Sequence, residues 1–195
     1  MIGADAMKKK IAAAAAMVLC LSLLAYGTIA YFTAEDTAVN VITAGNIKIQ
    51  LQETMIPEDG GEPVAFHGPL ESLPGRELSK IVQVKNTGEH PAYVRIALQK
   101  EILRVQEHPE EPDLSLVSLN INTTDWTETD GYYYYNKPLA SGEITEPLFT
   151  TVSFAAEMDN AYQNSKTVIH IYAFGVQAEN NGPHISETAG WPEIQ

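Results

Sequence analysis

The sequence predicts an all-β fold: a two-sheet sandwich, jelly-roll-like, with long acidic loops. Three observations carry this prediction. Apolar and polar residues alternate in short runs, turn residues such as Gly, Pro and Asn separate the runs, and no long helical repeat follows residue 31. About 165 residues remain after the signal segment described below, which is enough for one domain with a sizeable core.

Seven runs are expected to form strands. In the first of them Ile47, Ile49 and Leu51 share one face, and polar residues take the other. The last run has β-branched and aromatic residues on both faces, which is typical of a central strand covered on both sides. The expected strands cover residues 45–52, 78–86, 93–102, 116–122, 131–136, 148–154 and 166–178.

Two segments between these runs are expected to be long loops. Residues 53–75 are rich in Pro, Gly and Glu, and residues 107–113 have the same character. Residues 153–165 are the one place where a short helix or turn is expected. After residue 178 the composition becomes polar, so residues 179–195 are expected to form a loose tail.

Residues 1–30 have the organisation of a signal peptide. Three lysines at positions 8–10 precede an uncharged apolar core over residues 11–25, which is shorter than the roughly 20 residues of a membrane-spanning helix. Extending the apolar count to Phe32 reaches spanning length, so an uncleaved anchor is the alternative. Small residues stand three before and one before the predicted cut. The residues that define this cleavage are Thr28, Ala30 and Tyr31.

The chain is strongly acidic. It carries 12 Lys and Arg against 25 Asp and Glu, a net charge of −13. Cleavage after Ala30 would remove three lysines and Asp5, leaving −15, and would also remove Cys20, the only cysteine. The mature chain could then form no disulfide, and its stability must come from packing. The acidity argues against nucleic acid as a partner and against unaided binding to an anionic membrane.

Four stretches of the sequence carry a resemblance to a known family. The N-terminal stretch reads GTIAYFTAEDTAVNVITAGNIKIQL, and the others read SLPGRELSKIVQVKNTGEHPAYVRI, DGYYYYNKPLASGEITEPLF and IHIYAFGVQAEN. Through them the chain resembles the TasA/camelysin family over most of residues 8–180. Members of this family are exported proteins of Gram-positive bacteria, processed by a dedicated signal peptidase of the SipW type.

The resemblance implies a jelly-roll-like sandwich and, for the best-known member, extracellular fibres of the biofilm matrix. In such fibres the mature N-terminal strand of one subunit completes the sheet of the next. Residues 31–44 suit this role, because an extended segment with apolar content can add a strand to an exposed sheet edge. The alternative is an ordinary first strand, paired within its own subunit. The predicted assembly residues are Phe32, Val39, Val41 and Ile42.

Camelysin is classed as a peptidase, so a zinc site has to be weighed. Zinc hydrolysis needs closely spaced ligands, as in a helical His-Glu-x-x-His motif, and no two histidines here have that spacing. The mature chain also lacks a cysteine nucleophile, a Gly-x-Ser-x-Gly elbow and a phosphate-binding glycine loop. The sequence therefore predicts no catalytic residue, no metal and no cofactor. The five histidines are His67, His90, His108, His170 and His184.

Four consecutive tyrosines stand in one predicted strand. A strand places alternate side chains on opposite faces, so two rings are expected to pack inward and two to stay exposed. Exposed tyrosines could stack on sugars or contact a protein, whereas the alternative is a sandwich strand with an amphipathic outer face. The residues are Tyr132, Tyr133, Tyr134 and Tyr135.

Together these features predict an exported structural protein of the cell surface or biofilm extracellular matrix. It is expected to assemble into fibres through its N-terminal strand after signal-peptide cleavage. The expected partners are the protein itself or a fibre-forming paralogue, and a SipW-type signal peptidase; the membrane is a partner only before cleavage. The alternatives are a camelysin-like extracellular metallopeptidase and a surface module that binds carbohydrate or protein. The expected parts are the signal peptide 1–30, the N-terminal strand segment 31–44, the sandwich 45–178 and the tail 179–195.

Secreted protein should begin at Tyr31, within a residue or two. Replacing Ala30 with arginine should block processing, because signal peptidases accept only small side chains at that position. Intact-mass measurement of secreted material checks both expectations. Secreted protein that still carries residues 1–30 would contradict the predicted cleavage.

Overall fold

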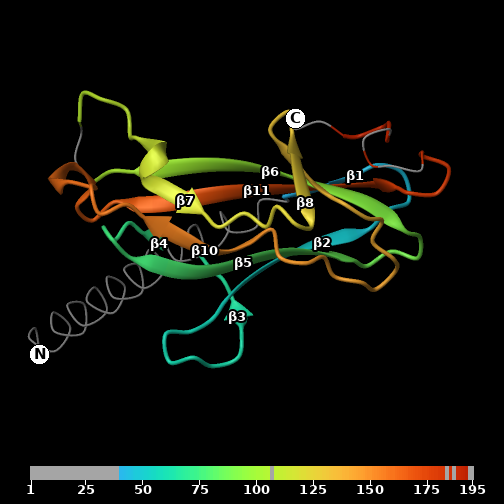
Figure 1. Cartoon of the computed structure of the whole chain (residues 1–195), viewed down its shortest axis with the longest axis horizontal. Helices are drawn as coiled ribbons and strands as arrows, with labels where there is room; N and C mark the ends of the chain where they lie inside the picture. Colours follow the sequence, from blue (N-terminus) through green and yellow to red (C-terminus); the bar gives the residue numbers. More distant parts are fainter. Residues whose placement is uncertain (1–39, 106–107, 183–184, 186–187, 193–195) are drawn as a thin grey trace, which may run out of the picture. The chain divides into compact units, whose positions relative to one another are not determined.

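The computed structural model describes residues 40–105, 108–182, 185 and 188–192 (Figure 1). Within them the chain forms eleven strands, arranged in two sheets that pack against each other, and two short 3-10 helices. The predicted all-β, two-sheet fold is confirmed. The 3-10 helices are η2 (Leu114–Leu116) and η3 (Asn160–Tyr162), and η3 falls in the segment where a short helix or turn is predicted.

The six-stranded sheet has the order β1-β11-β6-β9-β8, and β4 also pairs with β11. Its two longest strands, β6 and β11, are antiparallel and paired along their whole lengths, from Lys166 opposite Leu103 to Gln177 opposite Ala92. The strands of this sheet are β1 (Val41–Thr43), β4 (Leu70–Glu71), β6 (Ala92–Leu103), β8 (Trp126–Thr129), β9 (Tyr132–Tyr135) and β11 (Lys166–Gln177).

The five-stranded sheet has the order β3-β2-β5-β10-β7. All of its neighbouring strands are antiparallel, with β5 at the centre between β2 and β10. Its strands are β2 (Ile49–Met55), β3 (Val64–Ala65), β5 (Glu77–Asn86), β7 (Val117–Leu119) and β10 (Phe149–Phe154).

The core lies between the two sheets and is built from the apolar side of each alternating run. Val82 and Val84 of β5 and Val152 of β10 are fully buried on one side, and Ile96 of β6 and Ile171 of β11 are fully buried on the other. At Gly175 on β11 an added Cβ would lie 3.1 Å from Cγ2 of Ile47 and 3.2 Å from Cδ1 of Ile49. The missing side chain therefore lets β11 approach this end of β2 closely.

Each of the seven predicted runs contains a strand, and the central position predicted for residues 166–178 is confirmed by β11. The structure adds β3 and β4 inside the predicted loop 53–75, and β8 in a stretch for which no strand was predicted. β2 also continues to Met55, inside the predicted loop 53–75. β3 and β4 have two residues each, which is too short for an alternating pattern to be recognised in the sequence. β8 shows no alternation either, because three exposed polar residues follow Trp126.

Two buried polar side chains of β5 link this strand to other segments of the sandwich. Lys80 on β5 is 2% exposed; its Nζ contacts the carboxylate of Glu53 and lies 3.6 Å from the ring centroid of Phe66. Asn86, at the end of β5, donates from Nδ2 to the carbonyls of His90 and Leu139. Buried polar groups of this kind stabilise a fold only when their partners are in place, and here they have them.

Candidate assembly edge and tyrosine face

The N-terminal segment enters the described structure as β1, which lies parallel to β11. Val41, Ile42 and Thr43 stand opposite Ala173, Phe174 and Gly175 of the same chain. The Ala173 N–H donates to the Asn40 carbonyl at 2.7 Å, and the Ala44 N–H donates to the Gly175 carbonyl at 3.1 Å. Val41 packs against the core, and Ile42 alternates to the other face, beside Phe174.

Two of the four predicted assembly residues, Val41 and Ile42, are therefore strand residues within their own chain. The other two, Phe32 and Val39, lie outside the described residues, as do the cleavage residues Thr28, Ala30 and Tyr31.

On the side of β11 away from β6, two strands of the described part of the chain pair with it. At one end β4 pairs with Lys166 and Thr167, and at the other end β1 pairs with residues 173–175. Between them, residues 168–172 pair with β6 on one side and with no described strand on the other. We call this stretch of edge the β11 slot. Ile169 and Ile171 direct their N–H and C=O groups into it, because they alternate with Ala173, whose N–H points toward β1.

The four tyrosines of β9 divide between the two faces of the sheet. Tyr135 is buried in the core; its ring centroid lies 5.0 Å from that of Trp126, and its hydroxyl accepts from the Glu146 N–H at 3.3 Å. Tyr133 packs partly against the same core, and its burial, together with nearby Glu128, raises the pKa of its hydroxyl. Tyr132 and Tyr134 are half-buried on the opposite face.

That opposite face carries a buried arginine in an aromatic setting, which we call the Arg95 cluster. Arg95 is 7% exposed, donates to the Tyr134 hydroxyl at 3.2 Å and donates to the Pro192 carbonyl at 3.0 Å. The Trp191 ring also meets the Tyr134 ring edge-on, with centroids 5.7 Å apart. The guanidinium carbon lies 3.8, 4.7, 5.1 and 5.9 Å from the ring centroids of Tyr132, Trp191, Phe174 and Tyr134.

The two outward tyrosines of β9 thus contact the chain's own Arg95 and Trp191. Sequence reasoning missed both of these residues. Arg95 looked like an ordinary polar position of an alternating strand. Trp191 stands in the segment predicted to be a loose tail, and a tryptophan among polar residues was the one signal that could have marked it as an anchor.

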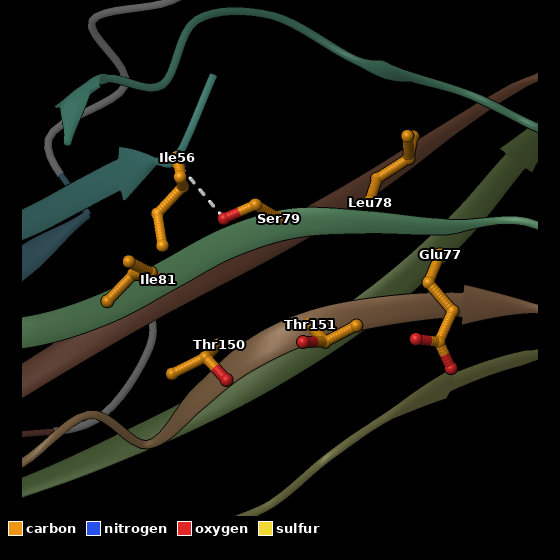
Figure 2. A pocket seen from close by; sticks show the side chains of 7 residues that line it. All are labelled: Ile56, Glu77, Leu78, Ser79, Ile81, Thr150 and Thr151. Atoms are coloured by element: carbon orange, nitrogen blue, oxygen red, sulfur yellow. Dashed lines mark hydrogen bonds between the residues drawn. The ribbon is translucent and has the colours of Figure 1, made fainter. Parts of the chain in front are cut away.

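A shallow hollow of about 450 Å³ lies on the five-stranded sheet (Figure 2). It sits on the face of β5 opposite buried Val82, and Ile56 donates its N–H to the Ser79 Oγ at 2.9 Å across its rim. Its single ionisable side chain is Glu77, so the hollow offers no acid–base pair and no activated nucleophile. It is lined by Ile56, Glu77, Leu78, Ser79, Ile81, Thr150 and Thr151.

The histidines that the structure describes do not converge. His170 Nε2 lies 3.3 Å from Glu101 Oε2 on the surface of the six-stranded sheet, and His90 Nδ1 lies 3.9 Å from Glu179 Oε2. His108 Nδ1 accepts from the Glu110 N–H at 3.3 Å. No group of three His, Cys, Asp or Glu side chains suited to a metal ion occurs in the described part of the chain. This donor set does not fit a zinc centre, which needs three or four convergent ligands. His184 lies outside the described residues.

No helix among the described residues is long and apolar enough to cross a membrane.

The fold defines this protein as a two-sheet β-sandwich whose first described strand, β1, pairs with β11 at a sheet edge. A family model described as camelysin metallo-endopeptidase matches residues 6–60, which include most of the predicted signal segment and all of β1 and β2. The resemblance to the TasA/camelysin family is confirmed over this stretch. Neither the comparison with curated proteins nor the comparison with solved structures gave a match.

The contacts of Trp191 predict a measurable contribution to stability. Replacing Trp191 with alanine should lower the free energy of unfolding by roughly 1–2 kcal/mol, because it removes a cation–π contact with Arg95 and an edge-on contact with Tyr134. Urea unfolding followed by circular dichroism measures the change. Val105→Ala, at a side chain that is 70% exposed, is the control and should change stability by less than about 0.5 kcal/mol. Equal values for the two variants would contradict an anchoring role for Trp191.

Proposed function

We propose that this protein is an exported structural component of the cell surface or biofilm extracellular matrix, and that it assembles into fibres through its N-terminal strand after signal-peptide cleavage. One observation carries the proposal: the N-terminal segment joins the sandwich as a short strand at a sheet edge, next to a stretch of that edge with no partner among the described residues. A segment that leads into such an edge can supply the backbone hydrogen bonds that link subunits.

The match to the camelysin family model supports the proposal, because it lies on the part of the chain that the proposal uses: most of the predicted signal segment, the N-terminal strand and β2. The partners in this proposal are further copies of the chain or a fibre-forming paralogue, together with a SipW-type signal peptidase. The membrane is a partner only while the leader is attached.

Charge would regulate this assembly. A mature chain at net −15 repels its own copies, so salt, divalent cations or acid pH should favour association. The attraction would come from buried apolar side chains. At about 25 cal/mol per Å², two of them contribute roughly 3–6 kcal/mol before the cost of ordering the strand.

The family model's description favours a second candidate, an extracellular metallopeptidase. A camelysin-like peptidase would need a metal centre, and the described histidines lie on separate elements, two of them beside a carboxylate. The candidate would therefore depend on residues that the structure does not describe.

Two chains test the fibre proposal. Residues 31–195 should form filaments visible by electron microscopy, whereas residues 40–195 should remain folded monomers. The shorter chain retains β1 and every described residue, so its near-ultraviolet circular dichroism should match that of the longer chain. Light scattering against salt concentration should show growth for the longer chain alone. Equal assembly by the two chains would show that residues 31–39 do not link subunits.

The peptidase candidate is tested separately. Purified 31–195 should carry no stoichiometric zinc and should leave casein intact, because the described histidines do not converge. Elemental analysis and a casein digest measure both properties. Stoichiometric zinc, with casein cleavage that a chelator abolishes, would establish the peptidase instead.

A further inference from the structure

The outer face of the five-stranded sheet carries little charge, although the chain is strongly acidic. Ile49 of β2, Val82 of β5 and Val152 of β10 are buried in the core, so the residues that alternate with them point outward. On β2 and β10 the outward side chains are uncharged amides and hydroxyls, such as those of Gln52 and Thr151. The charged outward residues of these three strands, which the structure describes in full, all lie on β5.

The outward residues of β5 form a self-complementary series. From one end of the strand to the other they are Glu77, Ser79, Ile81, Gln83 and Lys85. The order is a negative charge, a polar residue, an apolar residue, a polar residue and a positive charge. A second copy of β5, laid antiparallel on the first about its centre, would bring a lysine to each glutamate and isoleucine to isoleucine. A parallel copy would instead bring like charges together, so charge selects the antiparallel orientation.

The rest of this face suits the same arrangement. Two sheets that pack face to face keep their strand directions within about 30°, so the long side chains at the two ends of β5 can still meet. Exposed Ile144 bridges Lys85, and Ser153 pairs with Glu77. The antiparallel arrangement therefore places Ile144 of one copy over Ser153 of the other, next to Thr151 at the margin of the hollow (Figure 2). The contact is isologous, because each copy offers the same residues to the other.

We propose that two copies of this chain associate face to face through the outer side of the five-stranded sheet, with their β5 strands antiparallel about a two-fold axis at Ile81. Copies that each carry a net charge of −13 repel one another, and the repulsion is smallest where uncharged surfaces meet and each Glu77 faces a Lys85. The three longer strands offer roughly 400 Å² per chain, about half of a standard interface, so the contact should be weak and the chain monomeric in dilute solution. The contact uses no residue before β2, so it can be tested independently of the fibre proposal.

A charge exchange tests the orientation. Self-association of residues 31–195 is measured by sedimentation equilibrium at concentrations up to about 1 mM, where a contact of this size should populate a dimer. Lys85→Glu places like charges opposite each other twice and should weaken association about fivefold. Adding Glu77→Lys to the same chain restores opposite charges and should return the dissociation constant to within about twofold of the original value. Lys166→Glu, on β11 of the other sheet, changes the net charge equally and is the matched control, with an expected change below about twofold.

Cross-linking tests the location, because residues 31–195 contain no cysteine. Ile81→Cys places one thiol per chain at the proposed axis, and a short bismaleimide should join two copies about tenfold faster than it joins Gln99→Cys chains. Gln99 is the matched control, because it is exposed on β6 of the six-stranded sheet. Near-ultraviolet circular dichroism checks that each variant is folded.

Four results would overturn the proposed contact. They are an original chain that stays monomeric at the highest concentration, equal effects of Lys85→Glu and Lys166→Glu, a double variant no stronger than Lys85→Glu alone, and equal cross-linking through positions 81 and 99. Filament formation by residues 31–195 has no bearing on these outcomes, since the contact is measured between folded chains in solution.

Discussion

The pairing of β6 with β11 is the constraint on which the other features of the described structure depend. The two strands pair from Lys166 opposite Leu103 to Gln177 opposite Ala92, without a break in register. One face of this ribbon supplies Ile96 and Ile171 to the core, and the opposite face brings Arg95 beside Phe174. The side of β11 that faces away from β6 pairs with β1 and β4. A one-residue slip would exchange the two faces, so the core, the Arg95 cluster and the β11 slot are fixed together.

Much of this architecture could be predicted from the sequence, because its strands follow a period of two. Residues 45–52 show why: Ile47 and Ile49 are buried, as their alternation predicts. β8 was not predicted, because only Trp126 of its four residues is apolar. The turn from β8 to β9 does carry a sequence signal, the Asp-Gly pair. Asp130 and Gly131 form this turn with φ angles of 51° and 78°. The short β3 and β4 are held by pairing with β2 and β11 rather than by any local pattern.

The candidate sites were less predictable than the fold, because they depend on contacts between distant parts of the chain. The alternation in β9 correctly separates Tyr133 and Tyr135 from Tyr132 and Tyr134. It says nothing of Arg95 on the neighbouring strand or of Trp191 near the C-terminus, which cover the outward rings. Likewise, the apolar content of residues 31–44 indicates a strand, but only the pairing of Val41 with Ala173 shows where that strand joins a sheet.

Three other described sheet edges, β3, β7 and β8, are poor sites for association between chains. β3 has two residues, β7 has three, and β8 exposes Thr127, Glu128 and Thr129. Short length and a charged or polar side chain both discourage pairing between edges. The β11 slot differs, because it lies on a long central strand with Ile169 and Ile171 on its core face. The acidity of the chain adds to this protection, since a net charge of −13 makes copies of the chain repel one another at close approach.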